Sequence, residues 1–428
     1  MRLSQVKFKR IRLKVKRPTV QDLMLILFLV LTVFIPFTKI SIPAVGAYEL
    51  TFGDVTLIIL TLITFIYNGK IRKNFVPFFA VLLLFVFVCL CSMVMVRDWM
   101  RYFLSIVPFV FALMVSYATL SYFSSGDLKK RFIYFRFVVF ISLIISTIPV
   151  YLQFFFGIKN NLFYDAYGWR YSFLCQNPNQ YGIYFILYFF LITLITIKFF
   201  PKDLGKLLLI ELLFFIPAFF SGSMSTTIVF TANYIILLIY YIINASVIKK
   251  TALISIVAIF MSVFLGSFLE TVGESAGQVR RALSIFERVS NIQEFSIAGQ
   301  TGPTHDDAIY LFKTYPILGV GLGGKYAYTG RGVEIHSTFL LFLAETGAIG
   351  FFMFMLMFSL TPIYALFSRD KFQFILLIFI LYALFGALNI PAMLFRQRWV
   401  WFFLCISFIL VNLDKNYKNQ SSKLAILN

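Results

Sequence analysis

Long, continuous apolar runs recur along the whole chain and are separated mostly by short polar connections. A helix that crosses a bilayer needs about 20 mainly apolar residues, whereas a membrane β-strand alternates over about ten. The runs fit helices, so we predict an all-α polytopic membrane protein with about twelve transmembrane helices. The expected spans are residues 20–38, 50–67, 75–96, 101–122, 132–156, 179–200, 204–220, 224–245, 250–270, 338–367, 372–390 and 397–413.

These spans form a single predicted transmembrane domain, residues 1–428. The second span is the weakest, because Glu49 and Asp54 shorten its apolar run. The longest polar stretch, residues 271–335, joins the ninth and tenth spans. Connections of this length in compact proteins are usually functional, so we expect the chemistry of the protein to lie there.

Lys and Arg predict the orientation of the chain. Residues 2–17 carry eight of them, and placing this segment in the cytoplasm puts 25 of the 38 basic residues inside, as the positive-inside rule requires. Both termini are then cytoplasmic, and the long loop lies outside. The formal net charge of +20 reflects this topology and anionic lipid at the inner leaflet. It does not indicate binding to nucleic acid.

Arginine dominates the outer face. Its planar guanidinium binds phosphate through two parallel hydrogen bonds, whereas lysine is a point charge. A phosphate-bearing ligand outside the cell is therefore one interpretation, and snorkelling at the membrane interface or pairing with acids is the other. Nine of the 13 outer basic residues are Arg97, Arg101, Arg170, Arg280, Arg281, Arg288, Arg331, Arg396 and Arg398.

Other polar motifs have structural explanations. The four cysteines have neither disulfide nor metal spacing, and we expect no metal and no cofactor. His305-Asp306-Asp307 fits the first turn of a helix that is capped by Thr304 and ended by Pro316, which we prefer to a metal site. Asn177 and Pro178 fit the start of the sixth span, although amides there could also bind sugar hydroxyls. Glu211, inside a span, is expected to form a local hydrogen bond.

Gly319, Gly321 and Gly324 match the GxGxxG pattern. No βαβ unit follows, so this is not a dinucleotide-binding turn. The glycines either form an anion-binding nest of backbone N–H groups or a tight turn that needs positive φ.

His336 is the strongest candidate for chemistry. It stands where the long loop re-enters the membrane, close in sequence to Lys325 and Arg331. Histidine can accept a proton from a hydroxyl near neutral pH. The alternative is a histidine that caps a helix or bonds a carbonyl.

Three segments resemble the O-antigen ligase/polymerase superfamily. HSTFLLFLAETGAIG resembles the family's H-[NS]-x-x-L-x-x-L-x-E-x-G-x-x-G segment, YPILGVGLGG its Pro-x-x-Gly-Val-Gly stretch, and WRYSFLCQNPNQYG its Arg…Asn-Pro-Asn entry to a span. Their order, and the large loop between spans nine and ten, also match. The family's Ser-Arg-Gly at the start of span eight is absent, because residues 221–225 hold no arginine.

The resemblance implies a GT-C-like glycosyltransferase of the bacterial inner membrane, working without a metal at the periplasmic face on undecaprenyl-diphosphate-linked oligosaccharides. His336 would be the general base. The donor diphosphate would be held by basic residues of the outer face, namely Arg170, Arg280, Arg281, Arg288, Lys325 and Arg331.

The function we expect is that of an O-antigen or capsular polysaccharide polymerase, which lengthens a lipid-linked glycan by one repeat unit. Its expected partners are membrane lipids and, as a candidate, a chain-length regulator protein. Two alternatives stay open. A ligase would transfer the glycan to lipid A-core of lipopolysaccharide, and a lipid-linked oligosaccharide flippase would need neither His336 nor the long loop.

Overall fold

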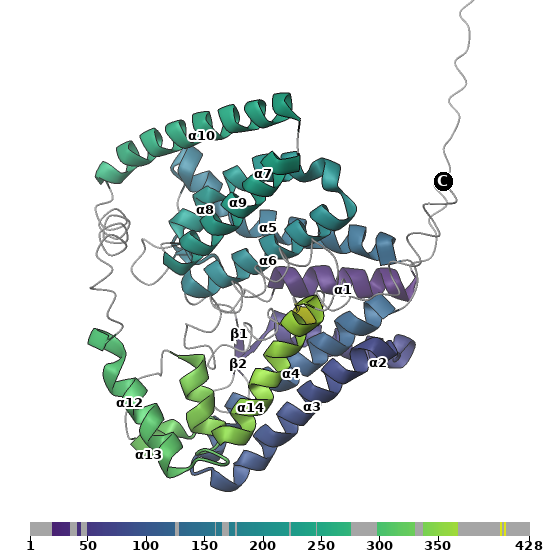
Figure 1. Cartoon of the computed structure of the whole chain (residues 1–428), viewed down its shortest axis with the longest axis vertical. Coiled ribbons are helices and arrows are strands. Elements are labelled where there is room, and N and C mark those ends of the chain that lie inside the picture. Colours follow the sequence, from purple (N-terminus) through teal and green to yellow (C-terminus); the bar gives the residue numbers. More distant parts are fainter. Residues whose placement is uncertain are drawn as a thin grey trace, which may run out of the picture.

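A computed structural model of the chain describes residues 19–34, 41–43, 49–124, 128–158, 160–164, 171–175, 178–221, 224–244, 246–274, 298–329, 337–366, 403–404 and 406–407. The described part is predominantly helical (Figure 1). Its helices are α1 (Val20–Phe34), α2 (Phe52–Asn68), α3 (Val76–Cys91), α4 (Trp99–Ser124), α5 (Leu128–Phe156), α6 (Pro178–Phe199), α7 (Leu204–Leu213), α8 (Phe215–Phe220), α9 (Met224–Asn244), α10 (Val247–Glu274), α12 (Ala298–Thr314), α13 (Lys325–Thr329) and α14 (Thr338–Leu366). Short 3₁₀ turns cover Lys73–Phe75, Ser92–Met95, Asn161–Phe163 and Pro201–Asp203.

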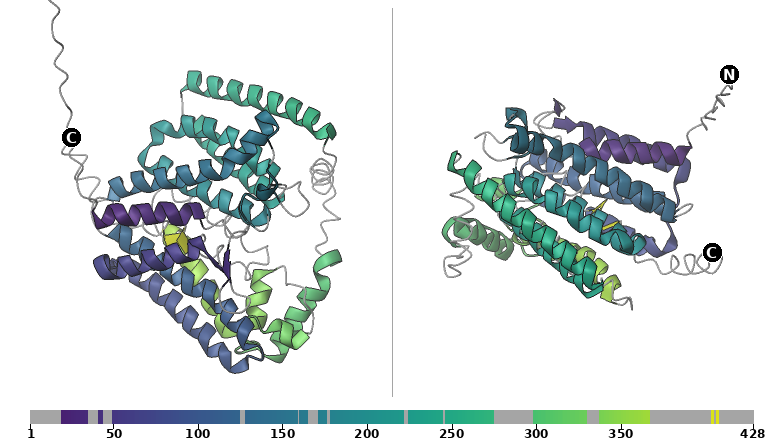
Figure 2. Two further views of the ribbon diagram at one scale, coloured as in Figure 1. Left: turned by 180° about the vertical axis from the view of Figure 1, so that it is seen from behind. Right: turned by 90° about the horizontal axis from the view of Figure 1, so that it is seen from above.

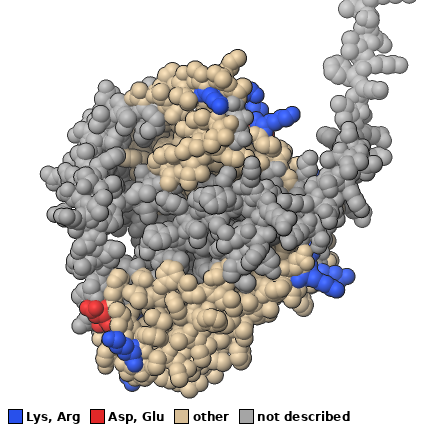
Figure 3. Space-filling model, in the orientation of Figure 1, with Lys and Arg blue, Asp and Glu red and all other residues tan. Residues whose placement is uncertain are grey.

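The predicted helical membrane architecture is confirmed at this level. By length and composition, five described segments could cross a membrane: Lys73–Met95, Trp99–Ser124, Lys130–Phe156, Gln180–Ile197 and Phe339–Met357, the last of which contains a bend described below. In the view of Figure 3 the described Lys and Arg side chains lie toward the edges, and most of the rest of the described surface on this face is uncharged. This distribution is typical of a protein that exposes an apolar band to lipid.

Helix α6 occupies the centre of the molecule, between α5 and α9 (Figures 1 and 2). All the described side chains of its membrane segment are buried. Its sequence is apolar all around, which is what a helix surrounded by other helices requires. Helices α1 to α4 pack on one side of it together with α14, and α10 lies at the opposite edge against α7.

One small sheet accompanies the helices. Strands β1 (Ser41–Pro43) and β2 (Glu49–Thr51) form an antiparallel pair just before α2. Thr51 and Asp54 then form a capping box, with Thr51 N donating to Asp54 at 2.8 Å and Asp54 N donating to the Thr51 hydroxyl at 3.3 Å. Asp54 therefore stabilises the start of this helix, although it shortens the apolar run.

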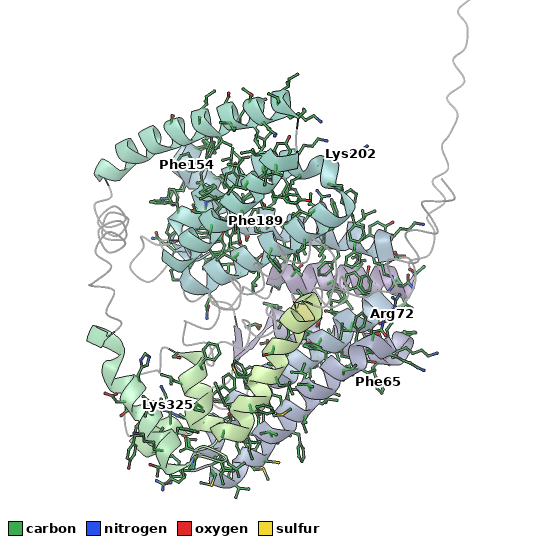
Figure 4. All side chains as sticks on the ribbon, in the orientation of Figure 1. Phe65, Arg72, Phe154, Phe189, Lys202 and Lys325 are labelled. Carbon is green, nitrogen blue, oxygen red and sulfur yellow. The ribbon has the colours of Figure 1, made fainter. Side chains whose placement is uncertain are left out.

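The connections between helices contact one another in two groups, one at each end of the helix bundle. At one end Arg72 N donates to Ser124 Oγ at 3.1 Å, and the rings of Phe132 and Phe199 stack at 4.9 Å. At the other end Tyr328 donates to Met95 O at 2.9 Å. Lys325 lies on the opposite side of the molecule from Arg72 and Lys202 (Figure 4). The contacts agree with the predicted alternation, because connections expected on one side of the membrane touch each other.

Candidate functional site

Helix α14 folds back on itself. Phe342 and Phe354 stack with ring centroids 4.1 Å apart, and Phe339 lies 6.1 Å from Phe354. In a straight helix, residues as far apart in sequence as Phe339 and Phe354 would be about 22 Å apart. Helix α14 is therefore a helical hairpin and not the single straight span that we predicted for residues 338–367.

The bend lies at Gly347, whose φ of 63° and ψ of −167° are not helical. The two arms are visible beside α3 and α13 in Figure 1. A β-carbon at this position would collide with the carbonyl oxygen of Ile317. Glycine is therefore required at position 347 for two reasons: it can adopt this backbone conformation, and it has no side chain.

The chain between α12 and α13 supplies the hydrogen bonds that the bend removes from the helix. Ala348 N donates to Pro316 O at 2.8 Å, and Val320 N donates to Ala344 O at 3.1 Å. Backbone groups buried at a helix break need such partners. The loop and the hairpin are therefore one hydrogen-bonded unit, which we call the loop–hairpin unit (residues 315–329 and 337–357).

The glycines of the loop confirm the tight-turn interpretation. Gly319, Gly321 and Gly323 have φ of 66°, 83° and 70°. Gly324, which we had included in the GxGxxG match, has no positive φ, but a β-carbon there would overlap Val320 O. All of these glycines are buried, and their packing leaves no space for side chains.

Glu345 occupies the anion-binding position of this loop. It lies next to the bend and is 2% exposed. Its carboxylate accepts hydrogen bonds from the backbone N–H groups of Gly323 and Lys325, while its Oε2 has no hydrogen-bond partner. The charge of Lys325, a residue that is only 4% exposed, attracts the same carboxylate. The nest that we considered for a ligand therefore holds a carboxylate of the protein itself.

Two exposed arginines stand next to this unit. The Arg97 guanidinium lies 4.0 Å from the centroid of the Tyr328 ring. Arg101 pairs with Asp98 at 3.3 Å, and its backbone carbonyl is close to Gly323. A guanidinium that is stacked on a ring keeps its N–H edge available to an anion. Both arginines belong to the predicted outer face, but the sequence gives no sign that they contact the loop, which lies more than 200 residues away.

Most of the predicted site residues are not described. His336, Arg170, Arg280, Arg281, Arg288 and Arg331 all lie outside the described residues. The first residue after His336 is described: Leu340 N donates to the Ser337 hydroxyl at 3.4 Å, and Leu341 N donates to Ser337 O at 2.9 Å. The N-cap of α14 is therefore Ser337.

The His305 motif corrects one prediction. Helix α12 begins at Ala298, so Thr304 lies inside the helix and does not cap it, and Asp306 and Asp307 are beyond the first turn. The end of this helix at Thr314, just before Pro316, agrees with the prediction. Among the described residues, no group of three His, Cys, Asp or Glu side chains could hold a metal ion.

The other motifs agree with their structural interpretations where they are described. Pro178 is the first residue of α6, while Asn177 lies outside the described residues. Thr193 donates to the Glu211 carboxylate at 3.1 Å, which is the local hydrogen bond expected for this acid. Cys89, Cys91 and Cys175 are free thiols, and Cys405 is not described.

No protein-family model matches this chain, and no curated protein is recognisably similar to it.

Proposed function

We propose that this protein is a polysaccharide polymerase, for O-antigen or capsule, that acts at the periplasmic face of the bacterial inner membrane. It would transfer a glycan from undecaprenyl diphosphate to a lipid-linked repeat unit. In this proposal the chain crosses the membrane about twelve times as a GT-C-like enzyme, and both of its termini are cytoplasmic.

The observation that carries the proposal is the loop–hairpin unit. It leads directly to Ser337, the residue after His336, and the exposed Arg97 and Arg101 lie against it. A general base on a fixed helix start, with arginines at the same end of the bundle, suits transfer from a diphosphate leaving group. Two of the three sequence resemblances, residues 315–324 and 336–350, fall on or directly beside this unit, and the third, residues 169–182, leads into α6.

In the proposed reaction, His336 and the arginines each have one role. His336 accepts the proton of an acceptor sugar hydroxyl while that oxygen attacks the anomeric carbon of the donor. The bond from this carbon to the phosphate oxygen breaks, and undecaprenyl diphosphate leaves with the electron pair. Arginine side chains stabilise the negative charge that develops on the diphosphate. We add Arg97 and Arg101, which the structure describes, to the arginines that were predicted to bind the diphosphate.

The test is a glycan ladder from cells that lack the protein and carry a complementing copy. Deletion should leave a single attached repeat, wild type should restore the ladder, and His336→Ala at equal expression should not. Full-length glycan left on its lipid carrier would instead identify a ligase. A normal ladder with His336→Ala would show that the imidazole is structural.

The arginines have a matched control. Arg136 also lies over a ring, 4.7 Å from the centroid of Phe200, at the opposite end of the bundle. Arg97→Gln with Arg101→Gln should slow polymerisation by at least about tenfold, while Arg136→Gln should leave the rate within about twofold. Equal loss in both variants would remove Arg97 and Arg101 from the proposed site.

A further inference from the structure

Gln180 has a buried side chain amide with no hydrogen-bond partner. Both its oxygen and its nitrogen are unpaired, and the residue is only 7% exposed. Among the described residues, no other buried side-chain amide has both its oxygen and its nitrogen unpaired. Buried polar groups are nearly always paired, so this amide requires an explanation.

The position of Gln180 indicates where a partner would be. It lies in the first turn of α6, which begins at Pro178. Side chains on a helix lean toward its N-terminus, so this amide is directed to the end of α6 that also exposes unpaired backbone N–H groups. That end is at the same side of the membrane, in the predicted topology, as the loop–hairpin unit.

Three tyrosine hydroxyls on or next to α6 donate to backbone carbonyls, whereas the buried hydroxyl of Tyr181 has no hydrogen-bond partner. The tyrosines one and two turns further along α6 donate inward, Tyr184 to Ser142 O at 3.2 Å and Tyr188 to Thr32 O at 2.7 Å. The Tyr171 hydroxyl donates to Ser146 O at 2.6 Å. Burial raises the pKa of Tyr171 well above its ordinary value, so this hydroxyl stays protonated. None of these three donors is left to pair with the Gln180 carbonyl.

A second unpaired amide oxygen lies at the same end of the neighbouring helix. Gln153 Oε1, near the end of α5, is buried and has no partner. Helices α5 and α6 pack against each other. No Lys, Arg, Asp or Glu occurs among the described residues between 137 and 197, since Lys159, Asp165 and Arg170 lie outside them. The described residues between 137 and 197 therefore offer polar but uncharged groups.

Such groups favour a neutral ligand with many hydroxyls. An amide offers two donors and an acceptor, and a hydroxyl can serve either role. A phosphate would find no described cation here. The rings of Tyr171 and Tyr181, whose centroids are 4.9 Å apart, add the apolar surface that small-molecule sites commonly provide around a few polar groups.

We propose that Gln180, with Gln153, binds a sugar ring of the lipid-linked glycan. This inference rests on the proposed function for the identity of the ligand, and it adds a carbohydrate subsite on α5 and α6, which are not the elements that carry Arg97 and Arg101. The subsite fixes the sugar, while the arginines and His336 act on the diphosphate and the attacking hydroxyl.

The test compares Gln180→Leu with Asn233→Leu in the full-length protein in lipid nanodiscs. Asn233, on α9, is a matched control because its buried amide oxygen is also unpaired. Two quantities are measured for each variant: the thermal unfolding midpoint without ligand, and binding of the cell's own lipid-linked repeat unit. Undecaprenyl diphosphate without sugar is the second probe.

The expected results separate a sugar site from a buried water. If a sugar is the partner, Gln180→Leu raises the unfolding midpoint by a few degrees, because an unpaired amide is gone. It also weakens binding of the lipid-linked repeat about tenfold and leaves binding of sugarless undecaprenyl diphosphate unchanged. Asn233→Leu raises the midpoint but binds both probes like wild type.

Three outcomes would overturn the proposal: unchanged binding of the lipid-linked repeat by Gln180→Leu, equal weakening for both probes, or no binding by wild type. A fall in the midpoint with unchanged binding would identify an ordered water as the partner. Polymerase activity is measured in a separate experiment, by the glycan ladder. A wild type that binds sugar but restores no ladder would contradict the proposed function and not the subsite.

Discussion

Glu345 and Lys325 illustrate how a buried charge pair can depend on the backbone around it. Each is almost fully buried, and the carboxylate also accepts hydrogen bonds from Gly323 N–H and Lys325 N–H. Removing one member of such a pair leaves the other charge buried and uncompensated, which is more costly than removing both.

We therefore expect Glu345→Ala to lower the free energy of unfolding by roughly 3–5 kcal/mol. The double variant Glu345→Gln with Lys325→Met should recover most of that loss, because the amide oxygen can still accept from the loop. Thermal and denaturant unfolding of the purified variants in one detergent would measure both. If the double variant is no more stable than Glu345→Ala, the pair is not the reason for the loss.

Sequence analysis could identify the glycines of the loop but not what they bind. Alternating glycine at 319, 321 and 323 is a local signal for positive φ, and all three positions have it. The occupant of the nest, Glu345, comes from a different element, and hydropathy gives no information about such a contact. Lys325 was predicted to bind the diphosphate. In the structure its charge faces Glu345, so that role stays a prediction.

At the scale of elements, the hairpin of α14 is the largest departure from the predicted fold. Its hydropathy is that of one continuous span, because an apolar run looks the same whether the helix is straight or folded. The Gly347 turn is visible in the sequence only as one of two glycines in ETGAIG. The bend depends on carbonyl and amide groups of residues 316–320, which a local reading cannot supply.

A cysteine pair can test the hairpin. In a cysteine-free background, Phe339→Cys with Phe354→Cys should cross-link within one chain through a reagent with a reach of under about 10 Å. The pair Phe137→Cys with Leu152→Cys, which has the same sequence separation on α5, should not. Cross-linking of neither pair would show that α14 is straight, and Gly347→Ala should weaken the first cross-link because it removes the bend.

At the scale of the whole molecule, contacts between connections support the alternation of the spans. Arg72 meets Ser124, and Tyr328 meets Met95. The sequence could predict this arrangement because apolar runs and basic connections are strong, local signals. The packing order around α6 could not be predicted, since it depends on which faces of the helices fit each other.

The orientation can be tested by cysteine labelling with a membrane-impermeant reagent. Val94→Cys and Ile158→Cys, both at exposed positions, should be labelled on cells whose outer membrane alone is opened. Lys70→Cys and Lys202→Cys, at the opposite end, should be labelled only after the inner membrane is opened. Labelling in the reverse order would invert the topology and place the proposed site in the cytoplasm.

The hairpin also determines how deep in the helix bundle the start of α14 lies. Its bend contacts the connection between α3 and α4 through the glycine loop, so the first arm, Thr338–Thr346, rises toward that end over about 13 Å. The start of the arm, at Ser337, is thus set below the rim of the bundle. In the proposed polymerase, the acceptor hydroxyl would meet the donor at this level, away from the rim. Water would then compete poorly for the activated glycan, and chain growth would be favoured over hydrolysis.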